Sequence, residues 1–331
     1  MSDPAVSVVI PTYNRADFIL ESVTSVLDQT FQDFEVVVVD DGSSDNTPAL
    51  IRSVADSRIR YLYQVNKGVA AALNMGWRAA RGDYIGRLDS DDRWHPDLLM
   101  RLVPTLESNP AIGLAYARAQ WMDQKGRRLP QMLGAPEKFP NQTLKSLLYG
   151  DFVCPVAVIF RRACIEQVNG YDETLIANED WDLWIRMSTL SRFAYLEEVL
   201  ADYRTHPGNL TSSASLRLAR LTDDRVRVLD KFYSNPEVPR AAWDIKQLAY
   251  RNVYMDIAMR WLYAGHWRTA MDYAGKAIRA SPHRPSAAIR LLYLVIFQRY
   301  LSKMSWGNRL VGWAVARRRS LAREADNSSE C

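Results

Sequence analysis

The sequence predicts an α/β fold in which a mostly parallel sheet lies between helices, followed by a C-terminal α-helical region. Short apolar runs alternate with amphipathic segments through about the first 90 residues, and from about residue 214 the chain is rich in helix formers. Such alternation favours a parallel sheet with helices on both faces. The chain has 331 residues, 48% of them hydrophobic, which is enough for one large domain and a smaller one.

The spacing of apolar residues gives the order of the expected elements. A short continuous apolar run predicts a buried strand, and apolar residues three or four positions apart predict a helix. The expected order is strand Val6–Ile10, helix Phe18–Leu27, strand Phe34–Asp40, helix from Thr47, strand Ile59–Gln64, helix Gly68–Ala80 and strand Asp83–Asp89.

Polar segments follow three of these strands. They read "PTYNR" after the first, "DDGSSD" after the second and "DSDD" after the fourth. Each has a structural explanation, since the first two could form turns and Asp92 could cap a helix near Pro96. In open parallel sheets, however, ligands bind beyond the carboxyl ends of the strands. Three such segments at these ends therefore indicate a binding site.

The spacing of Asp89 and Asp91 indicates a metal ion. Two carboxylates in an Asp-x-Asp pattern offer hard oxygen ligands to Mg²⁺ or Mn²⁺, and the cation can in turn bind phosphate oxygens. A dinucleotide-binding fold would need Gly-x-Gly-x-x-Gly after the first strand, where this chain has "PTYNR", and no P-loop is present. The sequence therefore predicts a divalent ion that carries a diphosphate.

Successive motifs between residues 6 and 211 resemble those of a known family. They are "VSVVIPTYNR", "SVLDQTFQDFEVVVVDDGSSDNT", "NKGVAAALNMGWRAARGDYIGRLDSDD", "NGYDE" and "NEDWDLWIRM". In this order they resemble family 2 glycosyltransferases, which have the GT-A fold. The resemblance implies a GT-A catalytic domain at residues 1–213. It also implies transfer of a sugar from a nucleoside diphosphate donor to an acceptor hydroxyl, with inversion at the anomeric carbon.

The resemblance assigns donor-binding roles to six residues, and Asp41 among them would accept a hydrogen bond from the base. The six are Pro11, Tyr13, Asp41, Asn66, Lys67 and Asp89. Gly68 and Asn74 match the same segment beneath the donor as Asn66 and Lys67. The family often has arginine where this chain has Leu73, so that cationic contact is not expected. The expected donor nucleotide is UDP, with GDP and dTDP as alternatives.

A metal site and a catalytic base are also implied. Asp91 and His206 would bind Mn²⁺ or Mg²⁺, and imidazole suits Mn²⁺ better. Inverting displacement needs a general base on the acceptor side, and Asp180 in "NEDWDLWIRM" is the expected base, next to Glu179. Two structural alternatives stay open. His206 could be an ordinary packing residue, and Asn178 could cap a helix whose first-turn acids favour the helix dipole.

The C-terminal region, residues 214–331, contains two further features. The segment between Trp243 and Pro282 resembles one tetratricopeptide-type helical hairpin, joined at Gly265 and His266, or it is a helical cap on the fold. The segment Arg290–Arg323 contains eight Lys or Arg and no acid, mixed with bulky apolar residues. Such a basic amphipathic tail predicts contact with an anionic membrane surface, or it is a charged, partly buried helix.

These features predict an enzyme of surface polysaccharide or lipid-linked glycan assembly, with a glycan or lipid-linked acceptor and no nucleic acid partner. Three unpatterned cysteines and the lack of a signal-like or spanning apolar segment predict a cytoplasmic protein, at the inner face of the membrane if the tail binds there. Two alternatives are a metal-dependent phosphoryl or nucleotidyl transferase and an inactive GT-A scaffold. The complete set Asp41, Asp89, Asp91 and Asp180 argues against the scaffold.

Overall fold

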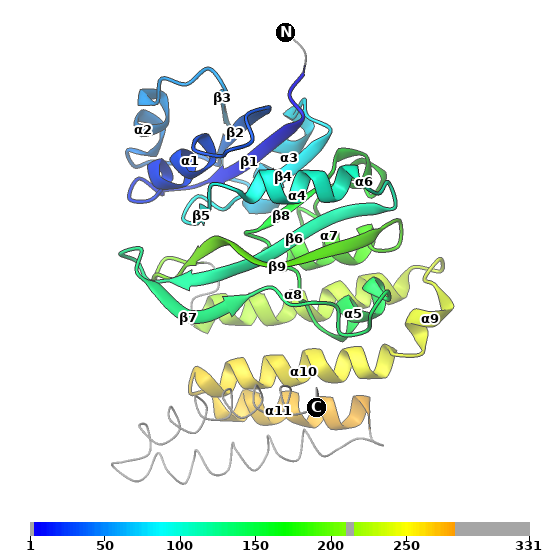
Figure 1. The fold of residues 1–331 in the computed structure, drawn as a ribbon. Coiled ribbons are helices and arrows are strands. Elements are labelled where there is room, and N and C mark those ends of the chain that lie inside the picture. The colour runs from blue at the N-terminus through cyan, green and yellow to red at the C-terminus, as the bar shows by residue number, and fades with distance from the viewer. Residues whose placement is uncertain (1–2, 210–214, 282–331) are drawn as a thin grey trace. The chain divides into compact units, whose positions relative to one another are not determined.

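The computed structural model describes residues 3–209 and 215–281 (Figure 1). The predicted basic tail Arg290–Arg323 and Cys331 lie outside these residues. The chain forms two compact units, Met1–Lys246 and Gln247–Cys331.

The first unit is built on a sheet of nine strands among the described residues. The strands are β1 Val6–Thr12, β2 Phe34–Asp40, β3 Ile59–Tyr63, β4 Tyr84–Arg87, β5 Arg93–Trp94, β6 Ile112–Met122, β7 Arg128–Leu133, β8 Val158–Arg161 and β9 Arg192–Arg204. Their order is β3-β2-β1-β4-β8-β6-β9-β5, with β7 paired to β6. The strands β1 to β4 are parallel, as predicted, but the rest of the sheet is mixed because β8 runs antiparallel to both β4 and β6.

Helices join these strands along the chain. In the first unit they are α1 Ile19–Leu27, α2 Thr47–Ser53, α3 Val69–Ala79, α4 Leu98–Glu107, α5 Thr143–Tyr149, α6 Arg162–Gln167, α7 Glu179–Met187, α8 Ser215–Ser234 and α9 Arg240–Trp243. The helix α10, Lys246–Tyr263, begins at the boundary, and α11, Trp267–Ala280, follows it in the second unit.

The seven elements expected before residue 90 all form, and their ends differ from the predicted ones by a few residues at most. The unbroken apolar runs of β1 and β2 predict them well because both strands are buried along their whole length. The interpretation of Asp92 as a helix cap is wrong. The helix α4 begins at Leu98 after Asp97, whereas Asp92 accepts the backbone N–H of Arg204 at 2.7 Å.

Helices cover both faces of the parallel strands, as the alternation predicted (Figure 1). Alternate strand residues such as Val8 and Val36 pack with α1, α2 and α4 in the larger core. On the other face, Val37 and Val39 pack with Ala72 of α3. Because each strand has apolar side chains on both sides, the carboxyl ends of β1, β2 and β4 are held in fixed relative positions at one edge.

The two compact units divide at 246/247, and the predicted domain boundary of 213/214 stays a prediction. The helix α8 is fastened to the first unit by charged contacts. Asp224 accepts the backbone N–H groups of Ile176 and Ala177 at 2.8 and 3.1 Å, and Lys231 pairs with Asp172 at 2.7 Å. Because Asp224 is buried, removing its N–H donors would be costly, so α8 is part of the first unit.

The second unit contains a pair of helices joined by a tight turn. The N–H of His266 bonds to the carbonyl of Trp261 at 2.9 Å, and Gly265 has φ of +83°. The rings of Tyr254 and Tyr273 meet across the two helices at 6.2 Å. Its likeness to a tetratricopeptide hairpin stays a prediction.

Two further sequence features concern the whole chain. Cys154 and Cys164 are both free and buried. Within the described residues, no helix has the length and apolar character needed to cross a bilayer.

We predict that Gly76→Ala destabilises the first unit. A Cβ at this position in α3 would lie 2.3 Å from Cγ1 of Val9 and 3.2 Å from Cγ2 of Val39, both in the packed sheet. Alanine should gain about 1 kcal/mol of helix propensity, but overpacking a core costs about 1–3 kcal/mol. We therefore expect a net loss of about 1 kcal/mol in urea unfolding. Gly150→Ala is the control, because nothing lies within 4 Å of its Cβ; equal stability of the two variants would contradict the prediction.

Candidate active site

The loops after β1 and β2 interlock at the carboxyl edge of the sheet. Asn14, at φ of 51°, accepts the N–H groups of Ser44 and Asp45 with its side-chain oxygen at 2.8 and 3.3 Å. In return, the hydroxyl of Ser43 accepts the N–H of Asn14 at 2.9 Å. The segments "PTYNR" and "DDGSSD", which the sequence placed at separate strand ends, thus form one surface.

Asp41 fastens a third loop to this surface. Its carboxylate accepts the backbone N–H groups of Lys67 and Gly68, each at 2.8 Å, and the side-chain amide of Gln64 at 2.7 Å. The expected donor-binding residues Asn66 and Lys67 are held exposed here. With three bonds already made, Asp41 has room for about one more donor.

The other expected nucleoside-binding residues occupy different environments. Pro11 is buried within β1, whereas Tyr13 is 45% exposed at the end of that strand. Asn74 lies apart from this loop, because its side chain bonds to both the N–H and the carbonyl of Tyr171 at 2.9 Å. It therefore fastens the "NGYDE" segment to α3.

A buried arginine joins the two acidic motifs. Arg87, at the end of β4, donates to Asp89 at 3.2 and 3.4 Å and to Glu179, the first residue of α7, at 3.0 Å. The side chains of Arg87 and Glu179 are 5% and 7% exposed. The sequence did not assign Arg87 a role. An arginine at the end of a buried strand, directly before three acids, is the signal that could have indicated a built-in counter-ion.

Burial and mutual contacts shift the pKa values of Arg87, Glu179 and Asp89. Burial opposes the charge on Arg87, but Asp89 and Glu179 together raise the pKa of Arg87, so it stays protonated. Burial is also the largest influence on Glu179, and it raises the pKa of that carboxyl to about 7 against the lowering effect of Arg87. Burial and the neighbouring Asp91 raise the pKa of Asp89, again against Arg87.

The two predicted metal ligands face each other. Nε2 of His206 lies 2.8 Å from Oδ2 of Asp91, and Nε of Arg15 lies 3.3 Å from the same oxygen. The imidazole packs on Phe18 with ring centroids 4.8 Å apart. Arg15 also donates to the carbonyl of Gly208 at 3.2 Å, so it links the loop after β1 to the His206 segment. The sequence predicted no role for Arg15, which lies within "PTYNR".

A second buried arginine, Arg204 at the end of β9, holds the Asp-x-Asp loop in place. Its Nε donates to the carbonyl of Asp91 at 2.7 Å, Nη1 to the carbonyl of Gln124 at 3.1 Å and Nη2 to Glu21 at 2.5 Å. Its backbone N–H bonds to Asp92. The sequence did not indicate a role for Arg204, because its partners lie about 80 to 180 positions away.

The first turn of α7 carries three acids in different environments. Glu179 pairs with Arg87, and Asp182 pairs with Arg186 at 2.7 Å and with Lys231 at 3.0 Å. Asp180 is half-buried and forms no ion pair within the part of the chain that the structure describes. Its Oδ1 accepts the N–H of Trp181 at 2.7 Å.

The alternative in which Asn178 caps α7 is wrong in its mechanism. Asn178 does stand at the N-cap position, but at φ of 59°, and its side chain makes no cap hydrogen bond. The side-chain amide instead donates to the carbonyl of Leu221 at 3.1 Å, in α8. The left-handed backbone at Asn178 turns the chain so that Glu179 and Asp180 begin the helix.

Among residues 3–209 and 215–281, no group of three or more His, Cys, Asp or Glu side chains is arranged to hold a metal. Asp91 and His206 are a carboxylate and an imidazole with converging donor atoms, a pair compatible with Mn²⁺. The remaining positions of a six-coordinate ion could be filled by the diphosphate and water. Asp91 and His206 therefore fit a metal ion that binds together with a diphosphate.

The sequence and the fold both match glycosyltransferases. The family profile described as "Glycosyl transferase family 2" matches residues 7–168. An uncharacterized glycosyltransferase of Rickettsia prowazekii is 32% identical over 232 residues, which cover 66% of this chain and 70% of that protein. Chondroitin synthase of Escherichia coli is 28% identical over 208 residues, covering 62% of this chain but 30% of its own length.

Solved structures of TarS and of a mannosyltransferase share the fold. Residues 1–349 of S. aureus TarS in complex with UDP-GlcNAc superpose with a TM-score of 0.64 at 21% identity, covering 87% of this chain and 84% of that one. The mannosyltransferase PcManGT of Pyrobaculum calidifontis, in complex with GDP-Man and Mn²⁺, superposes with a TM-score of 0.60 at 21% identity, covering 95% and 87%. The GT-A fold is thereby confirmed.

We predict that Glu179→Gln flattens the pH dependence of stability. A carboxyl whose pKa rises from 4.5 to about 7 on folding stabilises the protein fully below pH 4.5, and this stabilisation is lost as the pH rises through 7. The loss amounts to as much as about 3 kcal/mol, since one pKa unit is worth about 1.36 kcal/mol. The difference in the free energy of unfolding between pH 5 and pH 8 should therefore be smaller in the variant.

The exposed Glu107 provides the control, as Glu107→Gln should keep the wild-type pH dependence. If Glu179→Gln also kept it, ionisation of Glu179 would not be the cause.

Proposed function

Because this chain belongs to glycosyltransferase family 2, we propose that it transfers a sugar from a nucleoside diphosphate to an acceptor hydroxyl, with inversion at the anomeric carbon. The observation that supports this most directly is at the start of α7. Asp180 is the first-turn acid without an ion pair in the described residues, and its neighbour Glu179 is tied through Arg87 to Asp89 of the Asp-x-Asp motif. A carboxylate without an ion pair among the described residues thus lies beside the proposed donor motif.

The donor would lie along the loops at the carboxyl edge of the sheet. Asp41 would use its remaining acceptor capacity for the base, with Pro11 and Tyr13 beside it and Asn66 and Lys67 on the neighbouring loop. We propose UDP as the nucleotide, and the complexes of TarS with UDP-GlcNAc and UDP support this choice by analogy of fold. The complex of PcManGT with GDP-Man keeps GDP as the alternative.

Asp91 and His206 would hold the metal, with Mn²⁺ ahead of Mg²⁺ because of the imidazole. The bound ion would neutralise negative charge on the diphosphate as it leaves. Arg15 already supplies one positive charge at Asp91, and Asp89, paired with Arg87, would lie closer to the ribose or diphosphate. This division leaves Asp91 as the direct ligand and Asp89 as a donor-binding residue.

Asp180 would act as the general base. As the acceptor oxygen forms its bond to the anomeric carbon, the bond from that carbon to the diphosphate oxygen breaks, and the hydroxyl proton passes to Asp180. The nucleoside diphosphate leaves as an anion. Asp180 suits this role better than Glu179, because a base must meet the acceptor and Glu179 is buried against Arg87.

The acceptor would be a glycan or a lipid-linked sugar, in assembly of a surface polysaccharide or a lipid-linked glycan. Similarity to chondroitin synthase is compatible with the first. The chain spans only 30% of that protein and of a longer Rickettsia bellii relative, so their complete activities are not carried over. Cytoplasmic location stays a prediction. Membrane contact through the segment Arg290–Arg323 also stays a prediction, because this segment lies outside the described residues.

The first test is a thermal-shift panel of the full chain with UDP, GDP, dTDP, CMP and NAD, each with and without Mn²⁺. A ligand at about 100 times its dissociation constant adds about 2.7 kcal/mol, or about 5 °C or more for a domain of this size. We expect a manganese-dependent shift with one nucleoside diphosphate. Asp91→Asn and His206→Ala should lose the manganese-dependent part and keep any shift seen without metal. Absence of a shift with every diphosphate, or a shift with NAD alone, would contradict the proposal.

The second test replaces the proposed base. Asp180→Asn should lower the rate of sugar transfer or donor hydrolysis by at least about 100-fold, because a general base contributes about 10²–10⁴. Binding of the nucleoside diphosphate should change little. Asp223→Asn is the control, since Asp223 is an exposed aspartate of the same unit. Near-normal turnover in Asp180→Asn would exclude this role.

Product analysis of the wild-type reaction separates the remaining alternatives. A glycosyltransferase releases the intact nucleoside diphosphate, whereas a phosphoryl or nucleotidyl transferase releases phosphate or pyrophosphate. A protein that binds the nucleotide without any turnover would match an inactive scaffold.

A further inference from the structure

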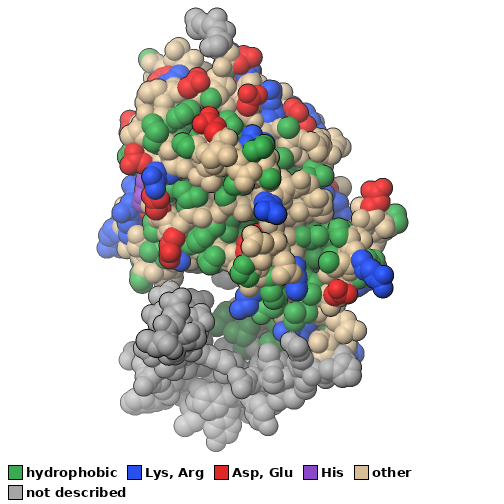
Figure 2. Space-filling model, turned by 45° about the vertical axis from the view of Figure 1, so that its right-hand side comes forward, with side chains coloured by type: hydrophobic (Ala, Val, Ile, Leu, Met, Phe, Trp, Pro, Cys, Tyr) green, Lys and Arg blue, Asp and Glu red, His purple; other side chains and the backbone are tan. Residues whose placement is uncertain are grey.

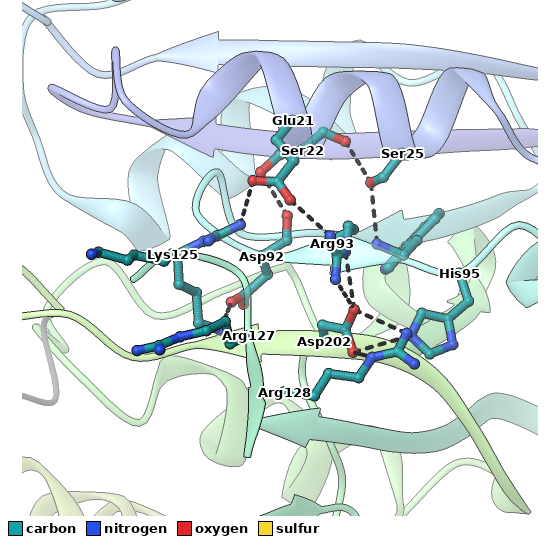
Figure 3. Close-up of polar contacts among 12 residues, drawn as sticks. Glu21, Ser22, Ser25, Asp92, Arg93, His95, Lys125, Arg127, Arg128 and Asp202 are labelled. Carbon is teal, nitrogen blue, oxygen red and sulfur yellow. Dashed lines mark hydrogen bonds and ion pairs between the residues drawn. The ribbon is translucent and has the colours of Figure 1, made fainter. Parts of the chain in front are cut away.

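A group of basic side chains surrounds the tip of the β6–β7 hairpin, residues 123–127, and the adjoining strand β5. We refer to it as the hairpin cluster, and its members are Arg93, His95, Lys125, Arg127 and Arg128. Figure 3 shows Arg93, His95 and Arg128 directed toward Asp202, whereas Lys125 and Arg127 extend to the other side of the hairpin. On the face drawn in Figure 2, Lys and Arg side chains gather beside a histidine at the left-hand edge.

The side of the cluster near Asp202 has more cations than its one carboxylate can neutralise. Asp202 is fully buried and is the register partner of Arg93 in the β5–β9 pair, and their side chains meet at 2.6 Å. The same carboxylate also contacts Arg128 at 2.9 Å and His95 at 3.1 Å. Hydrogen bonds from these groups, opposing the effect of burial, hold the pKa of Asp202 well below its usual range, so it carries one negative charge. Arg93 balances that charge, which leaves Arg128 in excess.

The side of the cluster at the hairpin tip also carries an excess cation. Arg127 pairs with Asp123 at 2.7 Å, and Arg204 behind the tip pairs with Glu21 at 2.5 Å. Lys125 is exposed, and its ammonium group has no partner among the described residues. One-to-one pairing therefore leaves two uncompensated positive charges, on Lys125 and Arg128. Arg127 and Arg128 are 77% and 50% exposed, so their outer N–H groups face solvent.

The hairpin cluster borders the candidate active site through Arg204. One guanidinium donates to the carbonyl of Asp91 at 2.7 Å and to the carbonyl of Gln124, at the hairpin tip, at 3.1 Å. The span of that group fixes the distance between the Asp-x-Asp loop and the tip. A chain of contacts from Arg204 through Glu21 and Arg93 to Asp202 continues to the other side of the cluster. Both excess charges therefore stand on a rigid support at the edge of the site.

We propose that the hairpin cluster binds negatively charged groups of the acceptor, which would then be an anionic glycan. This inference rests on the proposed function, because it names the acceptor of that reaction. Planar guanidinium groups suit phosphate and carboxylate alike, and Lys125 adds a mobile charge. Because Lys125 and Arg128 lie on opposite sides of the hairpin tip, they fit an extended acceptor with repeated charges better than a single ion (Figure 3). Such charges also speed encounter with an anionic polymer.

Binding of two soluble polyanions to the full chain tests this. Short-chain polyphosphate represents phosphate groups, and oligogalacturonate represents carboxylates on a glycan. We expect at least one to bind, more weakly as salt rises. Lys125→Gln with Arg128→Gln should weaken that binding about 3- to 10-fold, since two exposed charge contacts contribute up to about 1 kcal/mol each. The polymer that binds identifies the anionic group.

Two further variants test whether the loss of binding comes from a lower net charge or from misfolding. Lys138→Gln with Arg240→Gln removes the same charge from exposed positions elsewhere in the first unit and should leave binding unchanged. Lys125→Glu alone removes no described side-chain contact, so it should fold normally and still weaken binding. Equal loss in the control, or no loss in either cluster variant, would overturn the proposal.

The site of binding separates this inference from the proposed function. Bound polyanion should survive addition of UDP with Mn²⁺, and the cluster variants should keep the wild-type thermal shift with that nucleotide. Displacement by UDP would mean that the polyanion occupies the donor site, which would overturn the inference while leaving the proposed function intact. Cluster-dependent binding to vesicles of phosphatidylglycerol, without binding to either polymer, would also overturn it in favour of a lipid surface. Failure of every nucleotide to shift the wild type would instead reject the proposed function.

Discussion

The buried guanidinium of Arg204 is the contact on which the geometry of this site depends. It connects the carbonyl of Asp91, the carbonyl of Gln124 and the carboxylate of Glu21, which belong to three separate segments. Burying a charge is costly unless it is paired and its donors are satisfied. Here the pair with Glu21 and the hydrogen bonds to the two carbonyls meet both conditions. Loss of the guanidinium would leave buried acceptors without donors. The Asp-x-Asp loop is therefore held where it is before any ligand arrives.

Each of the three aspartates that follow β4 has different neighbours, which act on its negative charge in different ways. Asp89 is paired with Arg87, and Asp91 faces Arg15 and His206. For Asp92, burial raises the pKa well above its usual value, reinforced by the two neighbouring aspartates and opposed by the N–H of Arg204. Asp92 is thus a buried, structural group bonded to the backbone of Arg204, and Asp89 and Asp91 are left to interact with a ligand. The repulsion that three adjacent acids would otherwise feel is removed by separate partners.

The two adjacent acids of α7 are divided in the same way. Glu179 is buried against Arg87, which also bonds to Asp89, so it connects the helix to the donor motif. Asp180 lies half-exposed one residue later. A helix turns about 100° per residue, so neighbouring side chains face different surroundings. Such preorganised charges are effective in catalysis because they need little rearrangement during the reaction.

The sequence by itself determined the local elements and the chemistry at their ends. Unbroken apolar runs predicted β1 and β2, because a strand buried on both faces needs apolar side chains at every position. It also placed Asp41, Asp89 and Asp91 at strand ends, since each motif directly follows its strand. Roles for Asp180 and His206 came from the family resemblance alone. Those roles stay predictions, although the fold brings His206 to Asp91.

Only the tertiary structure decided which charges meet. Arg87, Arg15 and Arg204 are ordinary arginines in the sequence, and their partners lie as much as 193 positions away. The mixed half of the sheet was missed for the same reason, because the pairing of β8 with β4 and β6 depends on contacts between segments far apart. Periodicity reports which side of an element is buried, but not against what. Partner choice is a property of the packed chain, and this choice bonds Asp92 to a backbone N–H, pairs Asp89 with an arginine and leaves Asp91 as a candidate ligand.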